Sequence, residues 1–282
     1  MSVAADKIRN RQRIIWDKFA AGWKKWDAEL LDWQRPFGAA VIQGAGLRLD
    51  STVLDVASGT GEPGLTAAAL VPGGGVELTD ISAGMLQVAQ EKASTLGMGN
   101  VRFRVCDAAE LPFDDGTFDA VLCCFGLMFF PDMRAALREM VRTAKPGARI
   151  SAAVWGRAAA NPWASLVLGT LAQHTELPAP PADMPGLFRC SAPGFMTRLF
   201  RGVGLLAVQE RTVSTDLVHD SPASYWEFMT DIATTVATGL ALADEEARSL
   251  IRSDVFQMLG RYEHGGLLRL RSTATIVTGI RA

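Results

Sequence analysis

Hydrophobic and polar residues along this chain follow two alternating patterns between residues 50 and 155. Short apolar runs with the length of strands lie at residues 52–56, 76–79, 101–105, 118–123 and 149–155. Segments with helical spacing of apolar residues separate most of them, at residues 61–71, 82–96 and 131–144. Strands and helices that alternate with short connections indicate a parallel sheet built from crossover units.

The N-terminal segment has a helical pattern with unusually many tryptophans. Apolar residues between 7 and 46 recur mostly at spacings of three and four. We expect this stripe to be interrupted near Gly22 and ended by Pro36. Two interpretations remain open and can both hold: helices packed on the domain through aromatic anchors, or a lid that covers a bound ligand.

The second half of the chain is less regular. We predict helices at 161–174 and 191–200, the latter capped by Ser191, and mostly helical structure over 222–262. The Pro-rich residues 177–189 are expected to be irregular, and the last strands are placed at residues 205–213 and 267–278. A helical insertion between the last two strands predicts a cap. The three expected regions are an N-terminal helical lid (1–49), a Rossmann-like core (50–155), and the cap with the last two strands (156–282).

Composition narrows the class of protein. Charged residues make up 21% of the chain, the net charge is −2 and the pI is near 6.0, so nucleic acid is not an expected partner. The N-terminus is polar and no run reaches about 18 apolar residues, so we expect a soluble, cytoplasmic protein without an integral membrane segment. The four cysteines show no C-x-x-C pairing, and we expect buried thiols rather than a metal site.

The chain is organised around the stretch V-L-D-V-A-S-G-T-G-E-P-G at residues 53–64. An apolar run ends at Asp55, small residues follow, and a helical pattern resumes at Leu65. The glycines of this turn satisfy G-x-G-x-x-G, which lets backbone N–H groups approach a ligand that a Cβ would exclude. Taken alone, this turn is compatible with several nucleotide cofactors.

Three acidic residues end successive strands, at Asp55, Asp80 and Asp107. The carboxyl edge of an open α/β sheet is where ligands bind. Asp80 lies 21 positions after Gly59, the spacing at which a carboxylate reaches the hydroxyls of a ribose held on the first turn. Asp107 is one step further along the sheet, where it could accept from an adenine amino group.

These residues resemble the class I S-adenosylmethionine-dependent methyltransferases, in particular the ubiquinone and menaquinone C-methyltransferase group. The resemblance is carried by V-L-D-V-A-S-G-T-G, E-L-T-D-I-S-A-G-M-L, C-D-A-A-E-L-P-F-D-D-G-T-F-D-A-V and A-L-R-E-M-V-R-T-A-K-P-G-A-R, and it covers residues 50–155. It implies a doubly wound, mostly parallel seven-stranded sheet, with S-adenosylmethionine as cofactor and S-adenosylhomocysteine as product.

The resemblance also implies roles for individual residues. Asp55 and the backbone of Ala57, Ser58, Gly59, Thr60 and Gly61 would hold the methionine end of the cofactor. Asp80 would bind the ribose, Ile81 and Met85 would flank the adenine, and Asp107 would bind its amino group beside Ala108. Cys124 or Phe125 would face the sulfonium. Ala57 stands where the family usually has its first glycine.

The acceptor and the catalyst are harder to infer. Methyl transfer from a sulfonium can proceed by orientation and desolvation alone, so no acid or base is required. If a base acts, His174 and Tyr225 are the first candidates because both lie in the expected cap. Trp16, Trp23, Phe129, Trp155 and Trp163 could line an apolar acceptor pocket, or they could form the core of the cap.

We therefore predict methyl transfer from S-adenosylmethionine to a small apolar or aromatic acceptor, with the methylated atom (O, C or N) and the oligomeric state open. An NAD-dependent oxidoreductase shares the glycine turn and the acidic residue after the second strand, although no Tyr-x-x-x-Lys pattern accompanies them. A protein that keeps the cofactor as a structural element for a non-methylating reaction is the third hypothesis.

Overall fold

The structure is a computed structural model that describes residues 3–175 and 184–282, with side chains from residue 6 onward. Within these residues eight strands form one sheet, in the order β3-β2-β1-β4-β5-β8-β6, with β7 paired only to β8. The strands are β1 (Thr52–Val56), β2 (Gly75–Asp80), β3 (Val101–Val105), β4 (Phe118–Cys124), β5 (Ala144–Trp155), β6 (Leu206–His219), β7 (Glu263–His264) and β8 (Leu267–Ile280).

The direction of the strands matches the predicted fold class. Strands β1 to β5 pair in parallel, while β8 is antiparallel to both β5 and β6. The strand order reverses between β1 and β4, which is the switch point where open α/β sheets bind ligands. The prediction of a doubly wound, mostly parallel seven-stranded sheet is confirmed, with the two-residue β7 as an addition.

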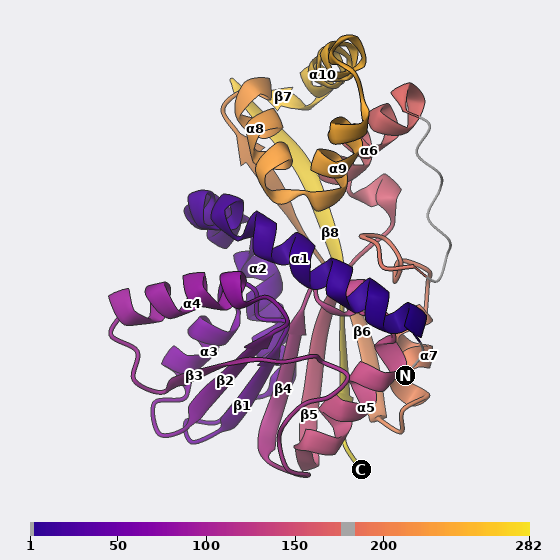
Figure 1. Cartoon of the computed structure of the whole chain (residues 1–282). Coiled ribbons are helices and arrows are strands. Elements are labelled where there is room, and N and C mark those ends of the chain that lie inside the picture. Colours follow the sequence, from indigo (N-terminus) through magenta and orange to yellow (C-terminus); the bar gives the residue numbers. More distant parts are fainter. Residues whose placement is uncertain (1–2, 176–183) are drawn as a thin grey trace.

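Ten α-helices surround the sheet in the described residues. They are α1 (Val3–Lys25), α2 (Asp27–Ala45), α3 (Gly64–Leu70), α4 (Ala83–Thr95), α5 (Met133–Thr143), α6 (Pro162–His174), α7 (Phe195–Arg201), α8 (Pro222–Ile232), α9 (Thr234–Leu242) and α10 (Glu245–Leu259). Helices α2, α3 and α4 lie on one side of the sheet, and α5 and α7 lie on the other (Figure 1). No helix in these ranges is long and apolar enough to cross a membrane.

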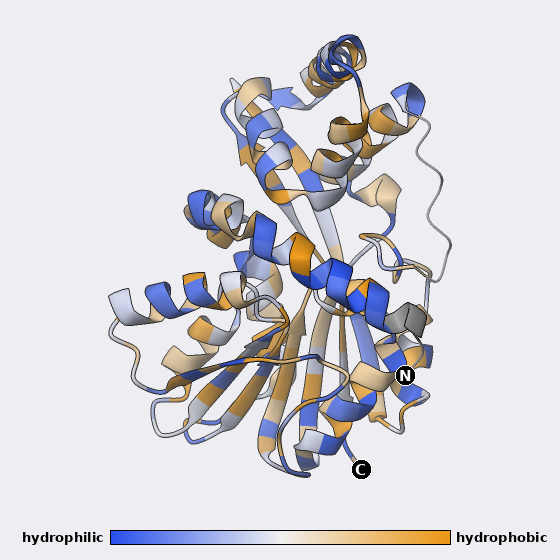
Figure 2. Cartoon of the chain, viewed as in Figure 1, coloured by the Kyte–Doolittle hydropathy of each residue, from blue (hydrophilic) through white to orange (hydrophobic). Residues whose placement is uncertain are grey.

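The remaining helices lie beyond the carboxyl ends of the strands. Figure 1 shows α6, α8, α9 and α10 grouped around the far ends of β6 and β8, and α1 crossing between this group and the sheet. We call α6 and α8 to α10 the cap. In Figure 2, helix α1 is largely hydrophilic, whereas the central strands are mainly hydrophobic. The division into lid, core and cap remains a proposal, but the helical insertion does lie between the last two long strands.

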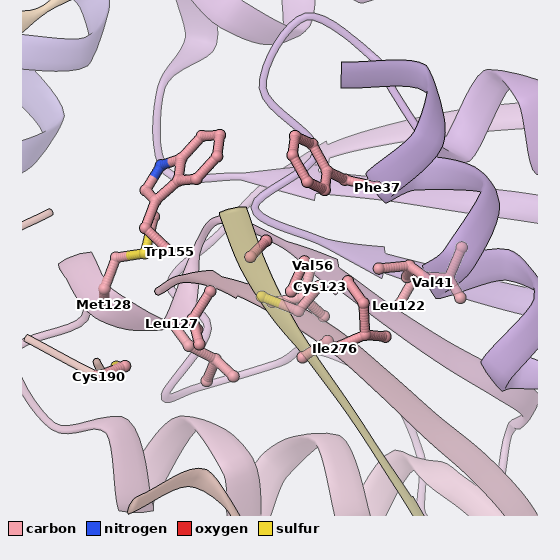
Figure 3. Packing of buried hydrophobic residues seen from close by; sticks show 14 of the residues in the cluster. Phe37, Val41, Val56, Leu122, Cys123, Leu127, Met128, Trp155, Cys190 and Ile276 are labelled. Carbon is pink, nitrogen blue, oxygen red and sulfur yellow. The ribbon is translucent and has the colours of Figure 1, made fainter. Parts of the chain in front are cut away.

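The core sits between the central strands and helix α2. Phe37 and Val41 of α2 are fully buried beside Leu122 and Cys123 of β4, as Figure 3 shows. Burying each large apolar side chain contributes about 1.5–3 kcal/mol. This packing fixes the ends of β1 and β4, from which the site residues project.

Pro36 does not end the N-terminal helix, so that prediction is wrong. It lies inside α2, and the break between the two helices falls at Trp26 rather than at Gly22. An internal proline costs about 3 kcal/mol, but Trp33 and Phe37, on either side of it, are both buried against the sheet and the cap. The tertiary contacts outweigh the local preference.

Several element boundaries also differ from the predictions. Helix α3 begins at Gly64 rather than at Gly61, and Ser191 does not cap α7, whose N-cap is Gly194. Strand β5 already begins at Ala144 and includes Gly147, whose φ of +79° accompanies a register shift against β4. Strand β6 extends to His219 because it pairs with β8 over its whole length. Of the predicted irregular segment, residues 177–183 lie outside the described residues, and residues 184–189 belong to no helix or strand.

Candidate functional site

The turn after β1 has an unusual backbone. Ala57 has φ +57°, Gly59 has φ +52° and Gly61 has φ +111°, so three residues of this turn occupy the left-handed region. Ser58 N–H donates to the Thr79 carbonyl at 2.9 Å, which ties the turn to the end of β2. A Cβ built on Gly59 would meet no atom within 4 Å. The turn therefore leaves an open space beside Gly59.

Asp80 closes the end of β2 and holds the same turn. One carboxylate oxygen accepts from Gly59 N–H at 2.9 Å and the other from Ser82 N–H at 2.8 Å. Burial raises the pKa of Asp80 to about 6, although the backbone donors of Ser82 and Gly59 oppose the shift. Asp80 is thus an anchor for the turn as well as a candidate ligand for hydroxyl groups.

Asp107 follows β3 and is shared between its own loop and helix α1. Its Oδ1 accepts from Ala109 N–H at 3.0 Å, and its Oδ2 forms an ion pair with Arg9 of α1. The second turn of α1 therefore lies over the end of β3. Nothing in the sequence pattern around Arg9 indicated this contact, because it joins residues about a hundred positions apart.

A group of packed aromatic rings, which we call the aromatic wall, lies at the end of β4. Phe125 has φ +59°, the left-handed conformation that bulky residues rarely adopt, and its ring stacks on Trp155 at a centroid distance of 3.9 Å. Trp155 in turn lies 4.8 Å from the Trp163 ring and 5.4 Å from the Trp33 ring. Strained backbone of this kind persists only where surrounding packing enforces it, and it is concentrated at functional sites.

Helix α1 makes hydrogen bonds both to the start of α4 and to the cap. Asp17 accepts from Ser82 Oγ at 2.6 Å and from Gly84 N–H at 3.1 Å, both at the start of α4. On the cap side, Trp23 Nε1 donates to the Ile232 carbonyl of α8 at 3.2 Å. Trp16 lies 5.2 Å from the Phe129 ring and 6.1 Å from the Trp23 ring. The helix therefore spans the gap above the carboxyl edge.

One cavity of about 250 Å³ joins these features. It is bounded by the turn after β1, the ends of β2 to β5, helices α1 and α2, and the cap. The sequence-predicted residues that line it are Trp16, Trp23, Ala57, Ser58, Gly59, Thr60, Asp80, Ile81, Met85, Asp107, Ala108, Cys124, Phe125, Phe129, Trp155 and Trp163. Trp155 and Trp163 also belong to the buried core, and their part in an acceptor pocket stays a prediction.

Asp55 and Gly61 do not line this cavity. Asp55 is fully buried, and its Oδ2 lies 2.7 Å from where a Gly64 Cβ would stand, under the turn. Burial raises the pKa of Asp55 to about 8, with the Gly64 backbone N–H opposing the shift. Asp55 therefore differs from the other predicted cofactor residues in lying outside the cavity lining, and its role at the methionine end stays a prediction.

Neither candidate base reaches the cavity. His174 Nε2 lies 2.7 Å from Asp254 Oδ2 of α10, on the outer part of the cap. Tyr225 is fully buried, its hydroxyl donates to the Trp163 carbonyl at 2.7 Å, and burial raises its pKa. Both side chains connect helices of the cap. The described residues contain no group of three or more His, Cys, Asp or Glu side chains that could hold a metal ion.

Sequence reasoning missed several charged residues of the cavity. Arg9, Asp27, Glu62 and Lys92 all line it, and Lys92 Nζ bonds to Asp27 Oδ1 at 2.7 Å. Of these four residues, Glu62 could have been identified from the sequence, because it lies inside the glycine turn itself. The others come from helices whose rotation about their axes cannot be deduced from spacing alone.

Comparisons with known proteins agree with this geometry. Residues 53–147 match the family model described as a methyltransferase domain. Over 111 residues the chain is 44% identical to the ubiquinone/menaquinone biosynthesis C-methyltransferase UbiE of Cellvibrio japonicus, covering 39% of this chain and 45% of that protein. The chain thus spans less than half of the length of this curated relative.

Solved structures share the fold over most of the chain. The YcgJ protein of Bacillus subtilis is 23% identical with a TM-score of 0.57, covering 86% of this chain and 97% of that one. The geranyl diphosphate C-methyltransferase of Streptomyces coelicolor A3(2) is 20% identical with a TM-score of 0.52, covering 92% and 83%. The predicted family resemblance is confirmed, and the fold agrees with it. Residues 53–147 are thus similar to a methyltransferase domain, and this part of the chain resembles the ubiquinone/menaquinone biosynthesis C-methyltransferases.

Proposed function

We propose that this chain transfers a methyl group from S-adenosylmethionine to a small, apolar, aromatic acceptor. The observation that carries the proposal is one continuous cavity, which extends from Asp107 and Asp80 past the glycine turn to the aromatic wall at Phe125. The polar part suits a nucleoside, and the apolar part suits a flat hydrophobic molecule.

The residues present fit the cofactor. The Ser58 hydroxyl lines the cavity and is buried without a hydrogen-bond partner among the described residues, and the space beside Gly59 is open. An ionised Asp80 would accept from the ribose hydroxyls, since a carboxylate has more acceptor sites than its two backbone donors occupy. Ile81 and Met85 offer apolar contacts to the adenine, and Asp107 offers an acceptor to its amino group.

The acceptor side contains mostly side chains that cannot exchange protons. Phe125, Phe129, Trp155 and Trp163 share it with Met229, Ile232 and Val236 of the cap. When bound, the cofactor supplies an electrophilic methyl group on a sulfonium, whose charge is lost in the transfer. The chain would exclude water, hold the acceptor against the aromatic wall and orient it toward the end of β4. Burial raises the pKa of the Cys124 thiol, so this residue would stay neutral there.

The name of the relatives supports a finer proposal. Because the similar UbiE proteins are named for C-methylation in quinone biosynthesis, we propose a ring carbon of a quinol-like or phenolic compound as the methylated atom. None of the comparisons supports the oxidoreductase hypothesis. The mass of the reaction products tests the hypothesis of a non-methylating reaction.

The test combines binding and product analysis. Calorimetry with S-adenosylhomocysteine should show binding that Asp80→Ala weakens strongly. Mass spectrometry after incubation with S-adenosylmethionine and a panel of alkylated quinols, phenols and polyketide-like aromatics should show the gain of one methyl group, and fragmentation should assign it to carbon. Absence of binding at high ligand concentration would reject the methyl-donor site. Conversion of an acceptor without a gain in mass would instead favour the non-methylating hypothesis.

A further inference from the structure

Glu62 differs from the other carboxylates that line the cavity. In the described part of the chain these are Asp27, Glu62, Asp80 and Asp107. Asp27 is paired with Lys92, Asp107 with Arg9, and Asp80 holds two backbone N–H groups. Glu62 Oε2 accepts only from Thr66, at 2.7 Å from Oγ1 and 3.3 Å from N–H. Within the described residues, Glu62 therefore has no cationic partner.

A half-buried carboxylate without a cation is a good binding site for one. Glu62 is shielded from solvent on part of its surface, and its second oxygen, Oε1, makes no hydrogen bond to a described residue. Charge–charge attraction strengthens as solvent is excluded, so a cation placed here would interact more strongly than at the surface. Its negative charge also reaches the neighbouring side chains, because it contributes to the raised pKa of the Cys124 thiol and of Asp55.

The position of Glu62 along the sheet edge indicates which cation it would meet. The order of the strands places Asp107 (after β3) and Asp80 (β2) on one side of the glycine turn, and Cys124 (β4) on the other. With the adenosine on the side of Asp80 and Asp107, the amino-acid end of the cofactor extends toward Glu62. Asp55 is fully buried and does not line the cavity, so Glu62 is the carboxylate after β1 that does line it.

Resting on the proposed function, we propose that Glu62 binds the α-ammonium group of the methyl donor and thereby positions its methionine end. Thr66 orients the Glu62 carboxylate from below through its hydroxyl and backbone N–H. The pairing places a negative charge on the loop that also approaches Cys124, so it helps to hold the sulfonium side of the cofactor near the acceptor. Glu62 would act as a positioning residue and would not exchange a proton.

The experiment compares two ligands in one variant. S-adenosylhomocysteine carries the ammonium group, whereas 5′-methylthioadenosine has the same adenosine and sulfur without the amino acid. We expect Glu62→Gln to weaken binding of S-adenosylhomocysteine roughly tenfold, as for loss of a charge-assisted hydrogen bond, and to change binding of methylthioadenosine by less than about twofold. Retained methylthioadenosine binding also shows that the variant is folded.

Two further variants sharpen the comparison. Thr66→Val keeps the Glu62 charge and removes one hydrogen bond to it, so a loss of only about two- to threefold is expected for S-adenosylhomocysteine. Glu62→Asp keeps the charge on a shorter side chain and should restore part of the affinity. Equal losses for both ligands in Glu62→Gln, or an unchanged affinity for S-adenosylhomocysteine, would overturn the proposal. A wild-type protein that binds neither ligand would reject the methyl-donor site itself, and the assignment of Glu62 with it.

Discussion

Asp17 of helix α1 accepts a hydrogen bond of 2.6 Å from Ser82 Oγ, the N-cap residue of α4. The same Ser82 donates its backbone N–H to Asp80, so α1 is connected to the candidate ribose ligand through one intermediate residue. Asp17 also accepts from Gly84 N–H. A helix that covers the cavity is thus attached to the cofactor side of the site.

We predict that Asp17→Ala weakens binding of S-adenosylhomocysteine. The variant removes both hydrogen bonds between α4 and a partly exposed carboxylate, which together are worth about 1 kcal/mol, so an affinity loss of roughly fivefold is expected in calorimetry. Lys24→Ala is the matched control, because its ion pair with Glu91 also joins α1 to α4 but is largely exposed. An equal effect of the two variants would argue against the Asp17 attachment.

The affinity for S-adenosylhomocysteine should depend on pH through Asp80. Its pKa is raised to about 6, and the ionised form is the better acceptor for ribose hydroxyls. Protonation therefore competes with binding, and the affinity should fall as the pH falls through 6, by roughly tenfold between pH 7 and pH 5. Calorimetry over this range with wild type and Asp80→Asn tests it, since the variant should bind weakly with little change. A pH response that persists in Asp80→Asn would assign the titration to another group.

Replacing Ala57 by glycine should stabilise the protein. Ala57 has φ +57°, a conformation that glycine adopts without the steric cost that a Cβ imposes. We expect the free energy of unfolding in urea to rise by about 0.5–1 kcal/mol. Ala207, with φ +48° at the start of β6, offers a control outside the site. Ala207→Gly should give a similar gain, and a loss of stability in both would show that the conformation is not strained.

Tyr225→Phe separates a structural role from a catalytic one. The hydroxyl donates to the buried Trp163 carbonyl and so joins α8 to α6, and loss of this hydrogen bond should lower the free energy of unfolding by about 1 kcal/mol. The side chain does not line the cavity, so kcat for methyl transfer should change by less than about twofold at a temperature where the variant is folded. A large drop in kcat together with unchanged stability would identify Tyr225 as the missing base.

The cofactor side of the site was largely predictable from sequence because it depends on strand ends. Asp80 and Asp107 follow apolar runs, and the carboxyl ends of parallel strands meet at one edge whatever the loops do. The glycine turn could be located for the same reason. Asp55 is at the expected strand end but is fully buried and does not line the cavity, because strand alternation alone does not tell which way its side chain faces.

The acceptor side was less predictable because helix orientation decides it. Trp16 and Phe129 were expected in the pocket as aromatic residues of the N-terminal helices and of the segment after the fourth strand. Arg9 and Lys92 were missed, although all four line the same cavity. Which side chains of α1 and α4 reach the cavity depends on how these helices are rotated about their axes and on where they cross the edge of the sheet. The Pro36 error has a similar origin, since the burial of Trp33 and Phe37 is a property of the assembled fold.

His219 should make the stability of the protein fall at mildly acidic pH. It is buried next to Trp26 and Phe228, its Nδ1 lies 3.0 Å from Ser224 Oγ, and burial lowers its pKa to about 4. In the unfolded chain the pKa is about 6.5, so the unfolded state binds more protons between pH 6.5 and pH 4. The contribution of His219 is therefore complete above pH 6.5 and decreases as the pH falls through this window, by about 3 kcal/mol at most.

Asp55 and Asp80 change the stability with pH in the opposite direction to His219. The contribution of His219 is therefore measured by comparing the wild type with a variant that lacks this histidine. Because their pKa values are raised in the folded protein, the folded state binds the extra protons and both residues add stability as the pH falls. His219→Gln removes only the histidine term. In urea unfolding at pH 7 and pH 4.5, the wild type should lose more stability, or gain less, than His219→Gln. Equal changes in the two proteins would mean that His219 accepts a proton as readily in the folded state as in the unfolded one.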